Sequence, residues 1–179
     1  MGWNLAPREP GRTLVAYATK CGVTAQSAVI IAETLRTKCG RTVDVVDLGR
    51  NKKPDITPYD SIFVGSGIRI GMWYGRARRF LKRDFGDRPV AVFISSCRAG
   101  DPAEHFQAVA SYLNRVLEKS RHLNLVASAA FGGRYIARGR TRTDNYDPAG
   151  VRAWAEEVGR LLGDGTGRAE QTGTGRETP

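Results

Sequence analysis

The feature that most constrains the fold of this chain is residues 13–24, in which a buried strand pattern leads directly into a helical one. Thr13–Ala18 is almost entirely apolar, which is typical of a strand covered on both faces. The residues that follow place Ala28, Ala32 and Leu35 on one helical face. The loop between the two patterns carries hydroxyls, a lysine and a glycine, and it comprises Thr19, Lys20, Cys21, Gly22, Val23 and Thr24.

A loop of this kind favours the binding of an anion. The first N–H groups of a helix have no partner within the helix, and the helix dipole adds partial positive charge at the same end. Thr19, Lys20 and Thr24 add hydroxyl donors and a full charge. Gly22 lets the backbone come close to a ligand. The sequence therefore predicts a site for a phosphomonoester in this loop.

The rest of the chain alternates between strand and helix patterns. Four more apolar segments are predicted to be strands: Thr42–Asp47, Asp60–Gly65, Pro89–Ile94 and Leu123–Ala130. Four helical patterns are predicted. The first ends near Gly40, the second spans about Tyr74–Phe85, the third begins at Asp101 and the fourth begins at Asp147. Each of the last two starts combines an acidic N-cap with Pro at the first helical position. This alternation predicts an α/β fold in which a parallel sheet has helices on both faces.

The side chains that these helices bury, and the loops between elements, are also predicted. The apolar faces of the last two helices are expected to consist of Phe106, Val109, Leu113, Val116, Val151, Trp154, Val158 and Leu161. Leu48–Tyr59 is expected to be a loop, and Phe131–Tyr146 a long basic loop. Because ligands of parallel sheets bind beyond the carboxyl ends of the strands, the loops after strands one, three, four and five are expected to surround one site.

Composition limits the domain organisation and the cellular compartment. We expect a flexible lead-in over residues 1–12, one domain over residues 13–163, and a disordered tail over residues 164–179. The chain has no secretory signal and no apolar run of the length that spans a membrane. Its three cysteines have no paired spacing, which is typical of a reducing compartment. We therefore expect a cytoplasmic protein, with peripheral contact to a membrane as an alternative.

The formal net charge of +10 favours anionic partners: nucleic acid, a phospholipid surface or an acidic small molecule. A uniformly solvated arginine-rich surface is an equally good explanation of the charge. Binding to nucleic acid ranks last, because no basic ladder interleaved with aromatic residues is present. The oligomeric state is left open.

Other motifs and side chains that could form a functional site are either missing or have a simpler explanation. The dinucleotide-binding and Walker glycine patterns are missing, and no metal-ligand cluster is present. His105 and His122 are expected on a helix surface. Cys21 is a reactive-thiol candidate, although an inert loop residue is favoured. Trp73 is expected in the core, and for Tyr74 the core and a ligand site are equally supported.

Together these features resemble a known family. The first loop, the order of the elements, the loop Gly65–Gly71 and the segment Phe131–Gly133 are similar to the flavodoxin-like fold. More narrowly, they resemble the flavodoxin-domain group that includes menaquinone-dependent protoporphyrinogen oxidase. The resemblance covers about residues 13–162 and implies a three-layer sandwich whose five parallel strands have the order 2-1-3-4-5. It also implies FMN as the cofactor.

The resemblance implies where FMN would bind. Its phosphate would lie at the first loop, and its isoalloxazine ring between the loops Ser66–Tyr74 and Ser95–Gly100. The implied contacts are Thr19, Lys20, Cys21, Gly22, Val23, Thr24, Ser66, Gly67, Ile68, Arg69, Tyr74, Ser96, Cys97, Arg98, Ala99 and Gly100. No catalytic side chain is expected, because the flavin carries the chemistry. Cys97 and Arg98 stand where electron-carrier flavodoxins usually place a stacking tyrosine, and those carriers are usually acidic.

Two functions follow from the resemblance. The first is an FMN-dependent oxidoreductase that passes electrons from a reduced substrate to a quinone-type acceptor. The second is a small electron carrier without its own substrate. Arginines suit the paired oxygens of a carboxylate-bearing substrate, and they suit a membrane surface as well. The candidates for this role are Arg76, Arg78, Arg79, Arg134, Arg138, Arg140 and Arg142.

Overall fold

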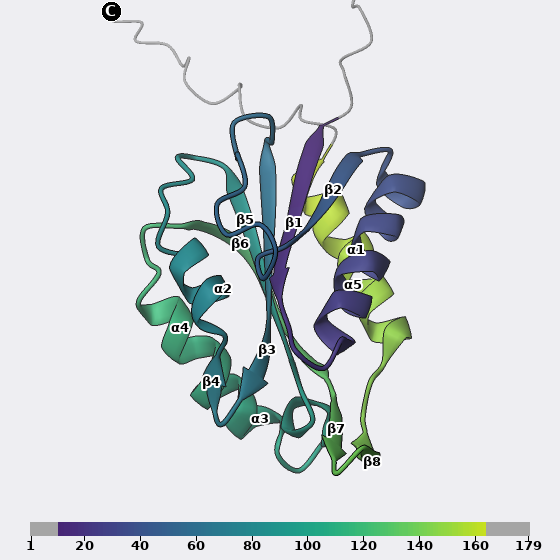
Figure 1. Ribbon diagram of the computed structural model, residues 1–179. Coiled ribbons are helices and arrows are strands. Elements are labelled where there is room, and N and C mark those ends of the chain that lie inside the picture. The colour runs from purple at the N-terminus through teal and green to yellow at the C-terminus, as the bar shows by residue number, and fades with distance from the viewer. Residues whose placement is uncertain (1–10, 164–179) are drawn as a thin grey trace, which may run out of the picture.

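A computed structural model describes residues 11–163, which form a three-layer α/β sandwich (Figure 1). Five parallel strands make the central sheet, in the order β2-β1-β3-β5-β6. Their bounds are β1 Arg12–Ala18, β2 Thr42–Asp47, β3 Ser61–Arg69, β5 Pro89–Ser96 and β6 Asn124–Gly132. The predicted parallel sheet and its strand order are therefore confirmed, and β1 begins one residue earlier than expected. The predicted tail and residues 1–10 of the predicted lead-in lie outside the described residues.

Three short strands add to this sheet or stand beside it. Strand β3 continues through residues that we expected in a loop, and it turns back into β4, Met72–Trp73, which pairs with it in antiparallel orientation. The predicted basic loop after the last parallel strand is wrong as well. It contains an antiparallel hairpin of β7, Arg134–Ala137, and β8, Arg140–Asp144.

Helices α1 and α5 cover one face of the sheet (Figure 1). Helix α1, Val23–Cys39, ends at the left-handed residue Gly40, as predicted. Helix α5, Pro148–Leu162, begins where expected, because the Asp147 side chain accepts a hydrogen bond from the backbone N–H of Ala149. Leu161 is the exception to the predicted apolar face: it is 64% exposed.

The opposite face carries shorter helices (Figure 1). They are α2 Gly75–Phe80, the 3₁₀ turn η1 Arg98–Gly100, α3 His105–Ala108, the π-helical turn η2 Val109–Asn114 and α4 Arg115–Glu118. The predicted helix start at Asp101 is wrong. Its carboxylate accepts a hydrogen bond from the Ala103 N–H at 3.0 Å within a local turn, and helical structure begins only at His105. Phe106 is correspondingly exposed rather than buried.

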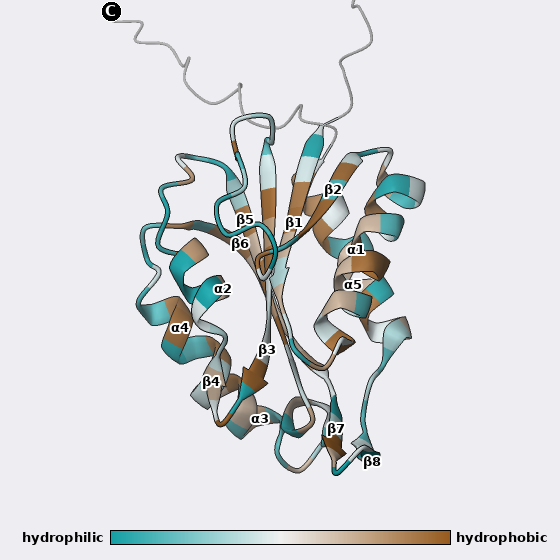
Figure 2. Ribbon diagram, in the orientation of Figure 1, coloured by the Kyte–Doolittle hydropathy of each residue, from teal (hydrophilic) through white to brown (hydrophobic). Residues whose placement is uncertain are grey.

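Apolar side chains fill both spaces between the sheet and the helices, and Figure 2 shows hydrophobic colour along the strands and on the helix faces that meet them. On the α1 and α5 side, the Trp154 ring packs edge-on against Phe63 and Phe131, with centroids 5.8 Å and 5.5 Å apart. Phe93 joins this group at 6.1 Å from Trp154. A side chain at Gly65 would overlap the Phe93 ring, so the close approach requires glycine.

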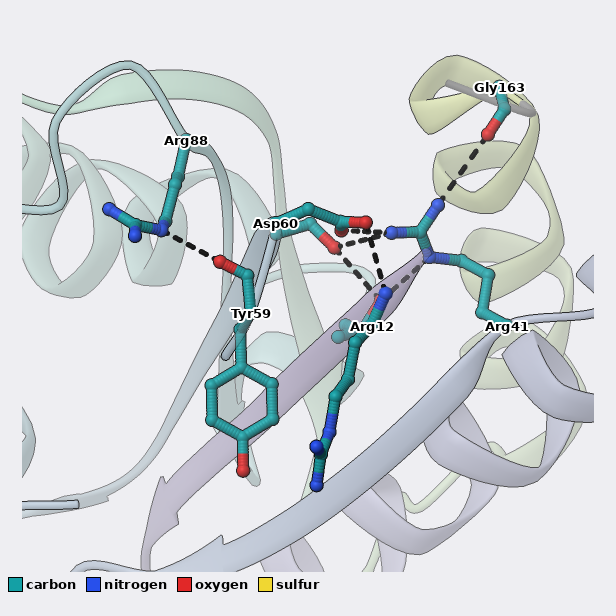
Figure 3. Close-up of polar contacts among 8 residues, drawn as sticks. Arg12, Arg41, Tyr59, Asp60, Arg88 and Gly163 are labelled. Carbon is teal, nitrogen blue, oxygen red and sulfur yellow. Dashed lines mark hydrogen bonds and ion pairs between the residues drawn. The ribbon is translucent and has the colours of Figure 1, made fainter. Parts of the chain in front are cut away.

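The amino ends of the strands are closed by a polar cluster around Arg41 (Figure 3). The Arg41 Nε donates to the Thr13 hydroxyl at 2.7 Å, and Nη2 donates to the Ser61 hydroxyl at 3.0 Å and to the Asp60 carboxylate. The two hydroxyls are themselves 2.8 Å apart. The Arg41 side chain is 6% exposed. This cluster joins β1, β3 and the turn after α1 at the end of the sheet opposite to the loops described next.

Candidate functional site

The loops that the sequence predicted to surround a site meet at the carboxyl end of the sheet, at the lower end of Figure 1. The strand register brings their first residues together. Ala18 lies opposite Ser66, and Gly67 lies opposite Ser95. Ser96 of β5 then lies opposite the last residue of β6. The predicted convergence of four loops at one edge is therefore confirmed.

The first loop leaves the N-terminus of α1 without a side-chain cap. Gly22 is the N-cap, with φ of +84°, and no acidic residue lies in the first turn. Within residues 11–163 the backbone N–H groups of Val23, Thr24 and Ala25 have no acceptor. A Cβ at Gly22 would meet nothing within 4 Å, so the space above it is open. These groups can bind an anion.

One predicted donor in this loop is partly occupied. The Gly22 N–H donates to the Thr19 hydroxyl oxygen at 3.2 Å, which leaves the proton of that hydroxyl available to a ligand. Lys20 and Cys21 are exposed. Thr24 is 1% exposed, so its hydroxyl lies beneath the loop rather than at its rim.

The exit of β3 packs directly against the first loop. A Cβ at Gly67 would lie 3.1 Å from Cε2 of Tyr74 and 3.3 Å from the Thr24 hydroxyl oxygen, so only glycine fits without displacing one of them. Ser66 is fully engaged, because its hydroxyl donates to its neighbour's carbonyl at 2.8 Å and accepts from the Tyr74 N–H at 3.0 Å. Trp73 is buried, as predicted, although it lies in β4 and not in the following helix.

Side chains from other segments of the chain hold the loop after β5 in place. The Arg98 guanidinium donates to Glu104 at 2.8 Å, to the Tyr112 hydroxyl at 3.1 Å and to Gln107 at 3.3 Å. The Cys97 carbonyl accepts from the Asn145 amide at 3.0 Å. The guanidinium of Arg98 is therefore engaged within the chain and fixes the loop.

The pKa shifts of Tyr74 and Cys97 reflect the closeness of the loops after β1, β3 and β5. Burial raises the pKa of Tyr74, and the neighbouring Cys21 raises it further against an opposing effect of Arg69. Burial likewise raises the pKa of the Cys97 thiol, with further contributions from Asp144 and Cys21. Cys97 and Tyr74 are therefore uncharged at neutral pH, and the positive charge near Tyr74 comes from the Arg69 guanidinium and the N-terminus of α1.

Tyr112 and Asn145 support the site but were not predicted. Tyr112 lies in the π-helical turn, where its carbonyl accepts from the Trp73 indole N–H at 2.7 Å while its hydroxyl holds Arg98. Tyr112 thus links the loop after β3 to the loop after β5. His105 has a related role, since its Nδ1 lies 2.6 Å from the Ala99 carbonyl oxygen. No local pattern in the sequence marks these long-range contacts.

One buried hydroxyl at this end of the molecule, that of Ser95, has no hydrogen-bond partner within the described residues. Ser95 is 6% exposed and lies at the carboxyl end of β5. An open anion cradle, a glycine-lined strand exit and an unused buried hydroxyl fit a ligand that joins a phosphate to a planar polar ring. In the described part of the chain, none of the helices has the length and apolar character that crossing a membrane requires.

The comparisons with known proteins agree with this geometry. Residues 14–147 match the family model of the flavodoxin domain. The chain therefore belongs to the flavodoxin-domain family, and FMN is the cofactor that this membership indicates. The fold and the oxidoreductase or flavodoxin-like role implied by the sequence are thus supported at the level of the family.

Individual relatives are more distant. The chain is 26% identical over 113 residues to "Protoporphyrinogen IX dehydrogenase [quinone]" of Escherichia coli strain K12, a match that spans 62% of each protein. The flavodoxin of Streptococcus pneumoniae TIGR4 superposes with a TM-score of 0.56 at 16% identity, over 84% of this chain and 99% of that one. A WrbA-like flavodoxin from Agrobacterium tumefaciens superposes with a TM-score of 0.57 at 13% identity, over 84% of this chain and 96% of that one. These two likenesses establish the fold alone.

Proposed function

We propose that this protein is an FMN-dependent oxidoreductase that passes electrons from a reduced, carboxylate-bearing substrate to a quinone-type acceptor. The observation that carries the proposal is the uncapped N-terminus of α1, where the N–H groups of Val23, Thr24 and Ala25 have no acceptor within the described residues. The printed name of the Escherichia coli relative, a quinone-linked protoporphyrinogen dehydrogenase, supports the reaction class.

Bound FMN supplies the redox chemistry, and the residues of this chain bind and orient it. The first loop binds the phosphate through main-chain N–H groups, the Thr19 hydroxyl and the Lys20 ammonium group. The loops after β3 and after β5 would hold the ring between them. The Ser95 hydroxyl offers a buried donor that nothing in the described residues uses. Arg98 and Tyr112 keep the second of these loops in place.

The arginines differ in their availability to a substrate carboxylate. Arg76 donates to the backbone carbonyls of Leu48 and Gly49, and Arg134 donates to Asp144 at 2.8 Å. The other candidates are exposed and form no ion pair within residues 11–163; they are Arg78, Arg79, Arg138, Arg140 and Arg142. The last three lie on the β7–β8 hairpin at the same end as the candidate site.

A small electron carrier is the second candidate function. It is favoured by the structural likeness to a flavodoxin of which this chain covers 99%. Against it stands the net charge of +10, because a basic carrier is repelled by the basic docking faces that acidic flavodoxins use.

Turnover distinguishes the two functions. The FMN-loaded protein is mixed with protoporphyrinogen and a soluble menaquinone analogue, and porphyrin fluorescence and quinone reduction are followed together. The oxidoreductase predicts flavin-dependent turnover in which three quinones are reduced for each porphyrin formed, because the oxidation releases six electrons and each quinone accepts two. If the bound flavin exchanges electrons with a reductase but neither compound turns over, the proposal is wrong and the carrier function takes its place. The flavin-free protein serves as the control for oxidation by air.

A further inference from the structure

Exposed apolar side chains gather at the end of the molecule that carries the candidate site. Eight large apolar side chains are exposed in the described part of the chain, and three of them lie elsewhere: Val29, Leu125 and Leu161. The other five lie on the β3–β4 turn, in β4, on α3 and on β7, and they are Ile70, Met72, Phe106, Tyr135 and Ile136. Figures 1 and 2 show these segments together at the lower end of the fold.

Ile70 is the least expected of these residues. It lies at the tip of the β3–β4 turn with φ of +48°, and Gly71 follows with φ of +69°. Two-residue turns with positive φ at both positions favour Asn, Asp or Gly at the first, because a β-branched side chain is strained there. Ile70 is also 85% exposed. Its backbone conformation and its exposure are both unfavourable in the protein alone, which points to a contact outside the chain.

Phe106 has a similar character on the neighbouring short helix. It is 86% exposed, although its spacing in sequence would suit a core position. Ile70 lies at the tip of a turn and Phe106 on a separate short helix, so these apolar tips come from different segments of the chain. Protruding apolar tips suit insertion between lipid headgroups better than a rigid protein surface, which requires a complementary contour.

The second hairpin adds positive charge beside these tips. Its turn is Arg138–Gly139, with φ of +52° and +73°. Arg138, Arg140 and Arg142 are exposed and form no ion pair among the described residues, while Arg134 neutralises Asp144. The exposed Tyr135 and Ile136 lie on the same hairpin.

We propose that this rim, defined by Ile70, Met72, Phe106, Tyr135, Ile136, Arg138, Arg140 and Arg142, is a docking surface for an anionic phospholipid membrane. The apolar tips would enter the headgroup region, and the arginines would bind lipid phosphates. Docking in this orientation directs the carboxyl end of the sheet, and with it the candidate site, toward the bilayer. The inference rests on exposure, backbone conformation and charge. Its residues overlap those of the proposed function, because Ile70 and Met72 lie in the segment after β3 and the three arginines are also candidates for a substrate carboxylate, but vesicle binding requires no turnover.

Vesicle co-sedimentation of the full chain tests the proposal, with vesicles of phosphatidylcholine alone or with added phosphatidylglycerol. We expect binding only to the anionic vesicles, and weakening as salt is raised. The triple variant Arg138→Gln, Arg140→Gln, Arg142→Gln should bind on the order of 100-fold more weakly. A matched control removes three exposed charges on and after α4, by Arg115→Gln, Lys119→Gln and Arg121→Gln, and should bind as the unmodified chain does.

The apolar tips are tested by Ile70→Asn combined with Phe106→Ser, which should weaken vesicle binding by about 10-fold or more. Asn suits the left-handed turn, so Ile70→Asn alone should raise the melting temperature while it weakens binding, which separates the membrane effect from unfolding. Leu161→Ser, at the far end of α5, is the control for exposed apolar area. The proposal is overturned by absence of binding at low salt, by equal losses in the control variants, or by retention on DNA without retention on vesicles.

Discussion

Replacing Arg41 by methionine is expected to destabilise the fold at the end of the sheet opposite to the candidate site. Methionine keeps the apolar stem and removes the guanidinium. The change removes charged hydrogen bonds to the Thr13 hydroxyl at 2.7 Å and to the Ser61 hydroxyl at 3.0 Å, together with the ion pair to Asp60. The two hydroxyls stay bonded to each other at 2.8 Å, so neither is left without a partner (Figure 3).

The size of the effect follows from the burial of each group. Hydrogen bonds from a charged donor contribute about 1.5–3 kcal/mol each, and the loss is smaller where the acceptor keeps a partner. The Asp60 side chain is 52% exposed, so water replaces much of its ion pair. We therefore expect a loss of about 2–3 kcal/mol, and a fall in melting temperature of roughly 5–10 °C for a domain of this size.

The assay is urea and thermal unfolding followed by circular dichroism. The matched control is Arg12→Gln, which removes an ion pair to Asp44 of 2.8 Å whose side chains are 47% and 40% exposed. An exposed pair contributes at most about 1 kcal/mol. FMN affinity should be the same in both variants. If Arg41→Met were no less stable than Arg12→Gln, the Arg41 cluster would not stabilise this end of the sheet, and the estimate would be refuted.

Three further predictions concern the site and the effect of pH. Thr19→Val preserves shape but removes the hydroxyl that the site offers to the phosphate, so FMN affinity by fluorescence titration should fall by about 10-fold with little change in melting temperature; unchanged affinity would place the phosphate elsewhere. Tyr112→Phe removes the hydrogen bond to Arg98, so backbone amides of the loop after β5 should exchange faster with solvent while those of α5 do not; equal exchange would exclude a positioning role. Partial burial raises the pKa of Asp44, but hydrogen bonds and charge from Arg12 outweigh it and hold that pKa below its usual value. The ionised Asp44 carboxylate therefore stabilises the folded state above about pH 4, and this stabilisation is lost as the pH falls through the lowered pKa. The urea midpoint of unfolding should fall in that pH range, and it should fall less in Arg12→Gln.

The elements that the sequence predicted best are those with explicit end signals and a long buried face. Helix α1 ends at Gly40 because that residue adopts the left-handed conformation, and α5 begins at Asp147 because its carboxylate caps the first turn. The same Asp–Pro signal at Asp101 gave a wrong helix start. There the carboxylate closes a local turn, and the residues that follow bury only Ala108 within α3.

The hairpin of β7 and β8 was missed for a different reason. Strand prediction depends on alternation between a buried and an exposed face, and β8 is exposed at every residue, so the sequence carries no such alternation. The anion loop was predicted because its residues are adjacent in sequence. Tyr112 was not, because it contacts Trp73 and Arg98, which are 39 and 14 residues away.

The relative affinity of the protein for FMN and riboflavin tests the central claim most directly, since the two flavins differ only in the phosphate. If the N–H groups of Val23, Thr24 and Ala25 bind that phosphate, FMN should bind at least about 100-fold more tightly than riboflavin when each is titrated by fluorescence quenching. Equal affinities, or the absence of binding by either flavin, would contradict the account.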